Sequence, residues 1–228
     1  MTQHLRLSQY VITWGPGAIL EGTRGPRIIL DPYIGLFRFL GLNPKDFEIT
    51  DKRMSVGLLK GNRIFELPSN AKLGFPHDKY IYRTNLFPQW KLCHNRRNHY
   101  FGPYTEFSVL FSGKYCPLCH SKKREHMEPI RFVMACPNGH LDDVDWYKIV
   151  HRSSSSCGHT KWFIWFERGS SIRDIDIICP RCNRHTNMGW AYEEKWDCSG
   201  RYPEKEEPTR YQPIRQGCSQ RATIIQRQ

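Results

Sequence analysis

Two Cys-Pro-X-Cys knuckles are the residues of this chain whose types and spacing point most directly to chemistry. They are Cys116-Pro-Leu-Cys119 and Cys179-Pro-Arg-Cys182. In each, the proline after the first cysteine allows neighbouring backbone amides to turn toward the thiolates. Two cysteines at this spacing supply half of a tetrahedral zinc site. We therefore expect a zinc ion at both knuckles.

The other cysteines can be grouped so that every one of them completes a tetrahedron. The chain has nine cysteines and ten histidines. The grouping that leaves no thiol over consists of Cys93, Cys116 and Cys119 with one histidine; Cys136, His140, His151 and Cys157; and Cys179, Cys182, Cys198 and Cys218. It predicts about three zinc ions.

Two points of this grouping depend on local geometry. The fourth ligand of the first site is His99, His94 or another group, and His99 is favoured because adjacent residues seldom bind one ion together. In the middle site, His140 and His151 bracket a segment with the pattern of a helix. A helix of about ten residues is roughly 15 Å long, so the flanking loops must fold back.

Disulfides and unliganded core cysteines are the competing interpretations. The first eight residues are polar and the apolar run at Val11 and Ile12 breaks at Gly15-Pro16-Gly17, so no secretory signal is expected and the compartment is reducing and cytoplasmic. An odd number of cysteines also argues against a disulfide framework. His151 could instead be a polar residue at a helix C-terminus, and Cys136 a core strand residue.

Composition predicts a small, irregular α+β protein. The 228 residues include 17 Gly and 15 Pro, and the mean hydropathy is −0.62, which indicates a limited regular core that bound metal must supplement. We expect zinc-ribbon-like knuckles, short β-hairpins and few helices. Residues 1–75 contain no cysteine and form one expected unit, and residues 76–228 form a zinc-binding region. No apolar run approaches membrane-spanning length.

Local patterns predict the elements that carry these residues. The second knuckle follows a hairpin strand directly, which is the local geometry of a zinc ribbon. The expected elements are strands at Tyr10–Trp14, Arg27–Leu30 and Arg131–Cys136, helices at Tyr33–Leu42 and Leu141–His151, a hairpin of Trp162–Phe166 with Ile172–Ile178, and an exposed charged loop at Pro203–Glu207.

The charge balance favours a polyanionic partner. With 34 Lys and Arg against 22 Asp and Glu, the net charge is +12, and a basic surface attracts nucleic acid through counterion release. The local clusters Arg96-Arg97 and Lys122-Lys123-Arg124 flank the first predicted site, and we expect them to contact DNA phosphates without sequence preference. The alternative is that this charge is solvated surface or faces an acidic protein.

Two longer motifs carry a resemblance to a known family. At Arg131-Phe-Val-Met-Ala-Cys-Pro-Asn-Gly-His-Leu-Asp-Asp-Val-Asp-Trp146 and Trp14-Gly-Pro-Gly-Ala-Ile19, the sequence resembles the B subunit (DrmB) of the DISARM anti-phage defence system. The likeness extends through the cysteine positions from His151 to Cys218. It covers the N-terminal part of that family, whose members continue into an MZB-type zinc-binding domain associated with helicases. One departure is Cys93-His94-Asn95-Arg96, where the family tends to show a further CxxC.

The resemblance implies a non-catalytic accessory subunit that works with a superfamily 2 helicase on foreign DNA. It also implies that the chain is a truncation, the product of a split gene or a short relative. An alternative is a pure protein-interaction subunit without DNA contact.

The residues offer one enzyme alternative, a metal-dependent nuclease built from His140 with Asp142, Asp143 and Asp145. We expect no enzyme, because those carboxylates fit the first turns of a helix and the predicted sites lack the open position that a catalytic zinc keeps.

Overall fold

The chain divides into two compact units in the computed structural model, which describes residues 6–23, 25–152, 157–158, 161–208 and 212–227. The first unit comprises Met1–Leu86 and Tyr202–Ile214, and the second comprises Phe87–Arg201 and Arg215–Gln228. The sequence expectation placed its boundary after residue 75 and assigned residues 202–214 to the zinc-binding region.

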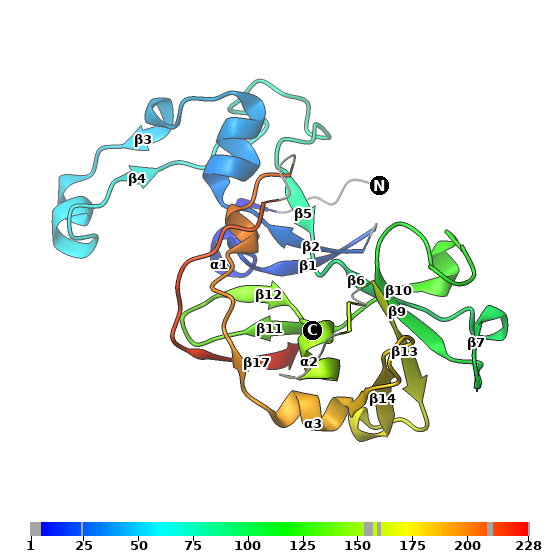
Figure 1. Cartoon of the computed structure of the whole chain (residues 1–228). Coiled ribbons are helices and arrows are strands. Elements are labelled where there is room, and N and C mark those ends of the chain that lie inside the picture. Colours follow the sequence, from blue (N-terminus) through cyan, green and yellow to red (C-terminus); the bar gives the residue numbers. More distant parts are fainter. Residues whose placement is uncertain (1–5, 24, 153–156, 159–160, 209–211, 228) are drawn as a thin grey trace. The chain divides into compact units, whose positions relative to one another are not determined.

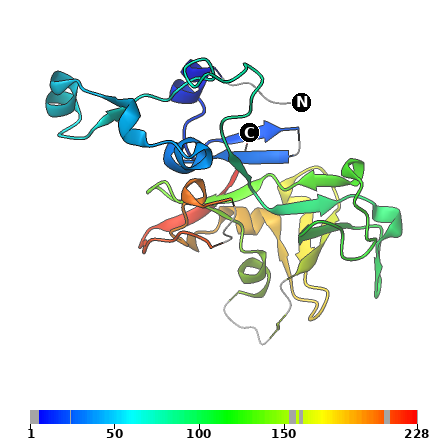
Figure 2. The same ribbon diagram turned by 90° about the horizontal axis from the view of Figure 1, so that it is seen from above.

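The first unit is organised around a three-stranded antiparallel sheet in the order β1-β2-β5 (Figure 1). A second, two-stranded hairpin of β3 and β4, drawn in cyan, extends away from this sheet (Figure 2). The elements are α1 (Leu7–Ile12), β1 (Ile19–Gly22), β2 (Gly25–Ile29), η1 (Tyr33–Arg38), η2 (Pro44–Phe47), β3 (Glu48–Ile49), η3 (Met54–Leu58), β4 (Ile64–Phe65), β5 (Thr84–Leu86) and η7 (Pro203–Lys205).

Two expectations for the first unit are confirmed and two are wrong. The strand at β2 and the helix that begins at Tyr33 and stops before Gly41 (φ 68°) are present. The expected strand at Tyr10–Trp14 is instead the end of helix α1, whose Val11 and Ile12 are 70% and 83% exposed. No strand among the described residues pairs with this segment, so it closes its own hydrogen bonds as a helix.

The charged segment Pro203–Glu207 is not an exposed loop. It contains the 3-10 turn η7, and Pro203 and Glu206 are buried. The Asp31 N–H donates to the Glu204 carbonyl at 2.8 Å, and the Asn85 side chain donates to the Glu206 carbonyl at 3.0 Å. These hydrogen bonds make the segment part of the first unit.

The second unit contains two larger antiparallel sheets (Figure 1). One has six strands in the order β10-β6-β9-β13-β14-β15, and the other has four in the order β12-β11-β17-β16. The elements are β6 (Trp90–Cys93), η4 (Arg96–Asn98), β7 (Tyr100–Phe101), β8 (Tyr104–Thr105), β9 (Ser108–Ser112), η5 (Arg124–His126), β10 (Met127–Pro129), β11 (Phe132–Ala135), β12 (Leu141–Asp143), α2 (Trp146–His151), β13 (Trp162–Glu167), η6 (Ile172–Asp174), β14 (Ile175–Ile178), β15 (His185–Asn187), α3 (Met188–Glu193), β16 (Trp196–Asp197) and β17 (Arg221–Gln226). The fold is thus the expected irregular α+β class, with short helices and hairpins.

Apolar side chains from both sheets and from α2 and α3 form the main core of the second unit. Trp146 of α2 meets Trp165 of β13 edge to face, with ring centroids 5.9 Å apart. The expected hairpin of β13 with β14 is present, with Ile164 opposite Ile178. Because β14 ends at residue 178, it delivers the knuckle at Cys179 from a fixed strand.

The segment Leu141–His151 differs from the expected single helix. Its first three residues form strand β12, which pairs with β11, and α2 begins only at Trp146. Asp145 is the N-cap, since its side chain accepts from the Lys148 N–H at 3.0 Å. Strand pairing therefore overrides the helical pattern at 141–143, a common outcome when a sheet edge is available. In the described part of the chain, no helix is long and apolar enough to cross a membrane.

Candidate metal centres

The structure gathers twelve Cys and His side chains into three clusters, each of three cysteines and one histidine. Within each cluster the potential ligand atoms all lie within 4.8 Å of one another. The clusters are Cys93, His99, Cys116 and Cys119 (cluster 1); Cys136, His140, Cys198 and Cys218 (cluster 2); and His151, Cys157, Cys179 and Cys182 (cluster 3). Each could hold a metal ion.

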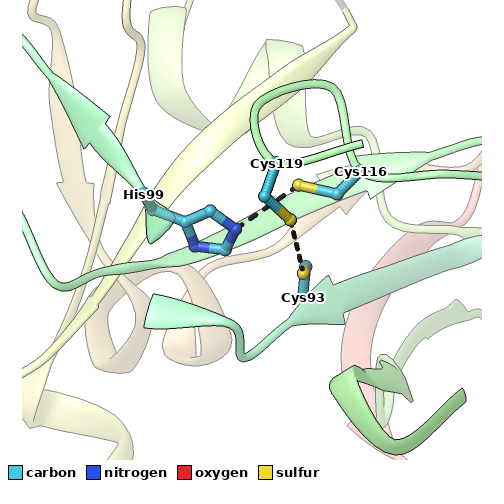
Figure 3. Close-up of side chains that lie close together, drawn as sticks. All are labelled: Cys93, His99, Cys116 and Cys119. Carbon is cyan, nitrogen blue, oxygen red and sulfur yellow. Dashed lines mark hydrogen bonds between the residues drawn. The ribbon is translucent and has the colours of Figure 1, made fainter. Parts of the chain in front are cut away.

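Cluster 1 joins the end of β6 to the knuckle that follows β9. Figure 3 shows the His99 ring directed at Cys116, with Cys93 beside Cys119. The buried His99 donates from Nδ1 to the Phe107 carbonyl at 2.7 Å, and its Nε2 lies 3.5 Å from Cys116 Sγ. Because the carbonyl fixes the proton on Nδ1, the lone pair of Nε2 faces the sulfurs. Such a backbone acceptor is the usual support of a metal-binding histidine.

The other candidate for this position, His94, lies outside the cluster. Its ring nitrogens contact the Ser108 hydroxyl and the Glu128 carboxylate, each at 3.0 Å. The geometry therefore brings His99 to the three cysteines.

Cluster 3 repeats this arrangement at the tip of the β14–β15 hairpin. His151, the last residue of α2, donates from Nδ1 to the Tyr147 carbonyl at 2.9 Å and places Nε2 3.4 Å from Cys182 Sγ. The sulfurs of Cys157 and Cys179 are 3.8 Å apart. The C-terminal turn of a short helix thus holds the histidine in the tautomer that leaves Nε2 open.

Cluster 2 lies at one end of the four-stranded sheet. Cys136 and His140 occupy the β11–β12 turn, and Cys198 and Cys218 lie in the long connection from β16 to β17. Here Nδ1 of His140 faces the sulfurs, 3.2 Å from Cys136 and 3.6 Å from Cys198. Since β17 pairs with both β11 and β16, the sheet brings the two distant halves of the cluster to the same end.

The grouping predicted for the middle and last sites is wrong. The sequence placed His151 and Cys157 with Cys136, whereas the structure places them with the knuckle at Cys179. The expected all-cysteine site is absent from the described residues, and Cys198 with Cys218 completes the set of Cys136. Because α2 separates His140 from His151, the two imidazoles serve different clusters.

Backbone geometry is shared by the two knuckles. In each, the first cysteine's carbonyl accepts from the N–H four residues on, from His120 to Cys116 and from Asn183 to Cys179, both at 3.0 Å. His120 and Asn183 have positive φ, at 53° and 57°. This left-handed residue turns the chain back so that amides point at the first sulfur.

The turn at Cys136-Pro-Asn-Gly-His140 is a third, shorter knuckle. The Gly139 N–H donates to the Cys136 carbonyl at 3.0 Å, and φ of Gly139 is 80°. The repeated Cys-Pro dipeptide was a sequence signal for three turns of one kind. A second signal is the six-residue spacing shared by Cys93 with His99 and by His151 with Cys157, the partners of the two longer knuckles.

Three thiols illustrate how the clusters shift pKa values. A hydrogen bond from Cys93, helped by His99, lowers the pKa of Cys116 to about 4 against the effect of burial. Burial opposes ionisation of Cys136, but the backbone and ring of His140 lower its pKa to about 7. Burial and neighbouring sulfurs raise the pKa of Cys198 to about 11. Closely spaced sulfurs cannot all ionise together unless a cation joins them.

The carboxylates of the nuclease alternative are engaged in structural contacts. Arg201, whose side chain is 9% exposed, contacts Asp142 Oδ1 at 2.6 Å and Asp143 Oδ2 at 3.2 Å. Burial raises the pKa of Asp143, although the Gln89 backbone N–H and Arg201 oppose the shift. Asp145 caps α2, and His140 faces the sulfurs of cluster 2.

The predicted phosphate-binding residues are placed differently from one another. Lys122, Lys123 and Arg124 are exposed beyond the first knuckle, with Lys122 over the Tyr115 ring. Arg97 is also exposed, whereas Arg96 is held by Glu167 and the Ser108 hydroxyl. The Arg96 guanidinium is therefore engaged by neighbouring side chains, and it is less available to a phosphate than that of Arg97.

These features define an α+β protein with three Cys/His clusters of one donor composition. The chain belongs to the family described as Domain of unknown function (DUF8724), whose model matches residues 6–228. It is also similar to the DISARM protein DrmB of Bacillus paralicheniformis, with 26% identity over 171 residues. The matched region makes up 72% of this chain and 28% of that relative, so the chain spans less than a third of the relative's length.

Proposed function

We propose that each cluster holds one structural zinc ion. In a tetrahedron with zinc–sulfur bonds of 2.3 Å and zinc–nitrogen bonds of about 2.0 Å, sulfurs lie roughly 3.75 Å apart and sulfur and nitrogen roughly 3.5 Å apart. The sulfur pairs Cys93–Cys119 and Cys157–Cys179 are 3.7 and 3.8 Å apart. A disulfide would require about 2.05 Å. Three cysteines and one histidine are a usual structural zinc set.

The chain acts, on this proposal, as a non-catalytic subunit of a DISARM-like anti-phage defence complex in the cytoplasm. The observation that carries it is the similarity to DrmB across most of the chain. Absence of catalysis is supported by the closed ligand sets, which leave no position for a substrate water. The engagement of Asp142 and Asp143 with Arg201 points the same way.

DNA and a superfamily 2 helicase are the proposed partners. The net charge of +12 favours a polyanion, and the exposed cations at Lys122, Lys123 and Arg124 offer phosphate contacts close to a rigid metal cluster. The proposed DNA contact does not depend on base sequence, since contacts to phosphates carry no base information. The proposal of a helicase partner rests on the family resemblance.

Fluorescence anisotropy with labelled DNA tests the DNA contact. The full chain should bind, with affinity that falls steeply as salt rises. The triple substitution Lys122→Ala, Lys123→Ala and Arg124→Ala should weaken binding and flatten the salt slope without loss of metal, because none of the three is a ligand. Absence of binding at low salt would leave a protein-interaction subunit as the function. Co-purification of a helicase with the tagged chain from its native cells tests the second partner.

A further inference from the structure

A cationic cavity of about 430 Å³ lies in the second unit beside cluster 3. Its walls come from the turn between β13 and β14, the strands β14 and β15, the start of α3, and the residue that follows α2. Figure 1 shows α3 next to β14 in this part of the unit. None of the sequence motifs or the proposed phosphate contacts uses it.

Three arginines, Arg152, Arg168 and Arg173, line this cavity together with two aspartates, so positive charge exceeds negative charge by one. Arg168 pairs with Asp176, and Arg173 pairs with Glu193 at 2.6 Å. Arg152 forms no ion pair with any described residue. Its guanidinium instead lies over the Trp190 ring, 4.0 Å from the centroid, which leaves its charge available to an anion.

The backbone of Arg152 is held in an unusual conformation. Its φ of 55° and ψ of −144° lie in a region that costs a non-glycine residue about 1–3 kcal/mol. The neighbouring His151 is fixed in cluster 3, so the cluster determines where the Arg152 side chain projects. Arg152 thus joins cluster 3, through His151, to Trp190 of α3.

The lining residue Thr186 does not present its hydroxyl to the cavity. Thr186, on β15, is 3% exposed, and its Oγ1 contacts no donor or acceptor among the described residues. Buried polar groups in folded proteins are nearly always hydrogen-bonded, and an unpaired one costs about 1–3 kcal/mol. Thr186 pairs with the buried Ile177, and strand alternation puts both side chains on the face opposite Asn187. This hydroxyl therefore faces the core and is out of reach of a ligand in the cavity.

Close packing also shapes the rim. A Cβ at Gly189 would lie 2.5 Å from Cγ of Arg173, and a Cβ at Gly169 would lie 2.4 Å from Oδ2 of Asp174. Both glycines allow the surrounding side chains to approach. Asp174 accepts from the Ser171 N–H, and Asp176 accepts from Asn187 as well as Arg168, so the cavity's carboxylates already have partners.

We propose that this cavity binds one nucleotide unit of a nucleic-acid strand, with its phosphate at the arginines and its base on the Arg152–Trp190 stack. Bases stack on aromatic rings and on guanidinium planes, and cations beside them take the phosphates. The inference rests on the proposed DNA contact and assigns it to this cavity in addition to Lys122–Arg124.

The test compares variants of the full chain for binding to labelled oligothymidylate. Arg152→Ala and Arg168→Ala should each weaken binding about tenfold. Thr186→Val keeps the side-chain shape and removes an unpaired hydroxyl that faces the core, so it should leave binding unchanged and thermal stability unchanged or higher. The matched control is Arg131→Ala, an exposed arginine away from the cavity. Circular dichroism and zinc content establish that each variant is folded.

The outcomes separate this inference from the proposed function. If the chain binds DNA but both arginine variants bind as tightly as the wild type, the cavity is not the site and the DNA contact stands. If the wild-type chain binds no DNA, both fail. Competition should be at least about tenfold stronger with thymidine monophosphate than with inorganic phosphate; equal competition contradicts base stacking. A strand that binds much more tightly than the mononucleotide identifies nucleic acid, and equal affinities identify a free nucleotide, as the source.

Discussion

At the scale of the residue, it is harder to predict which candidate ligands share a cluster than to predict which residues are candidate ligands. All twelve residues expected from spacing lie in the clusters, but Cys136 and Cys157 belong to different ones. Removal of one ligand opens a tetrahedron, and a second removal from the same set costs little more. The number of metal ions that a double variant loses therefore shows whether its two residues belong to the same cluster.

We predict that Cys157→Ser and Cys179→Ser each lose one zinc ion, and that their double variant also loses only one. The pair Cys136→Ser with Cys157→Ser should lose two, because these residues serve clusters 2 and 3. Native mass spectrometry of the four variants measures this. Loss of a single ion from the second pair would restore the grouping that the sequence suggested.

The buried Arg201 offers a second test at this scale. Arg201→Met should destabilise the second unit by about 3–5 kcal/mol at neutral pH, because it leaves the largely buried Asp143 without its cation, whereas Asp142 keeps Arg215 at 3.5 Å. The pKa of Asp143 is already raised by burial and would rise further. A carboxyl with a raised pKa in the folded state favours folding below that pKa and loses this contribution as pH rises through it.

The deficit relative to the wild type should thus shrink as pH falls from 8 to about 5. Chemical denaturation at several pH values gives the comparison. Arg131→Met, in an exposed pair with Glu128, is the control and should cost less than about 1 kcal/mol at every pH. A deficit independent of pH would mean that Asp143 is not the group left uncompensated.

At the scale of the element, the sheets decide which knuckle meets which partner pair. The Cys-Pro turns and the choice of His99 could be predicted from local spacing. The pairing of β17 with β11 joins residues 132–135 to 223–226. The local sequence of either segment does not predict this long-range pairing. Likewise, the pairing of Val133 with Asp143 displaced the predicted helix at 141–143. Long-range pairing was the missing information in both cases.

The stem of the connection between Cys198 and Cys218 has one critical glycine. Gly200 has φ 68°, and a Cβ there would lie 1.7 Å from the Gln216 carbonyl oxygen. Its N–H also donates to Cys198 Sγ at 3.3 Å. Gly200→Ala should therefore destabilise the second unit by at least about 2 kcal/mol and weaken zinc retention in cluster 2.

The matched control is Gly217→Ala, where a Cβ would meet nothing within 4 Å. Urea denaturation and zinc content should leave this variant close to the wild type. Equal stability of the two variants would contradict the close approach at residue 200.

At the scale of the whole molecule, the three clusters are concentrated in one unit. The first unit contains none of the nine cysteines, while its segment 202–214 departs from between two ligands of cluster 2. The sequence could predict the cysteine-free N-terminal unit from composition alone. It could not predict that residues 202–214 belong to the first unit. The charged residues in this segment suggested a solvent-exposed loop, and the burial of Glu206 arises only in the folded unit.

We propose that three zinc ions, each held by three cysteines and one histidine, maintain the second unit. The most direct test is elemental analysis with native mass spectrometry of the full chain, before and after treatment with a strong chelator. Amide hydrogen exchange is measured in the same samples, separately for the first and the second unit. The predicted result is close to three zinc ions per chain, and chelation should abolish protection in residues 87–201 and 215–228, since a structural zinc supplies on the order of 10 kcal/mol of folding free energy. One zinc ion or none per chain, or protection unchanged by the chelator, would contradict it.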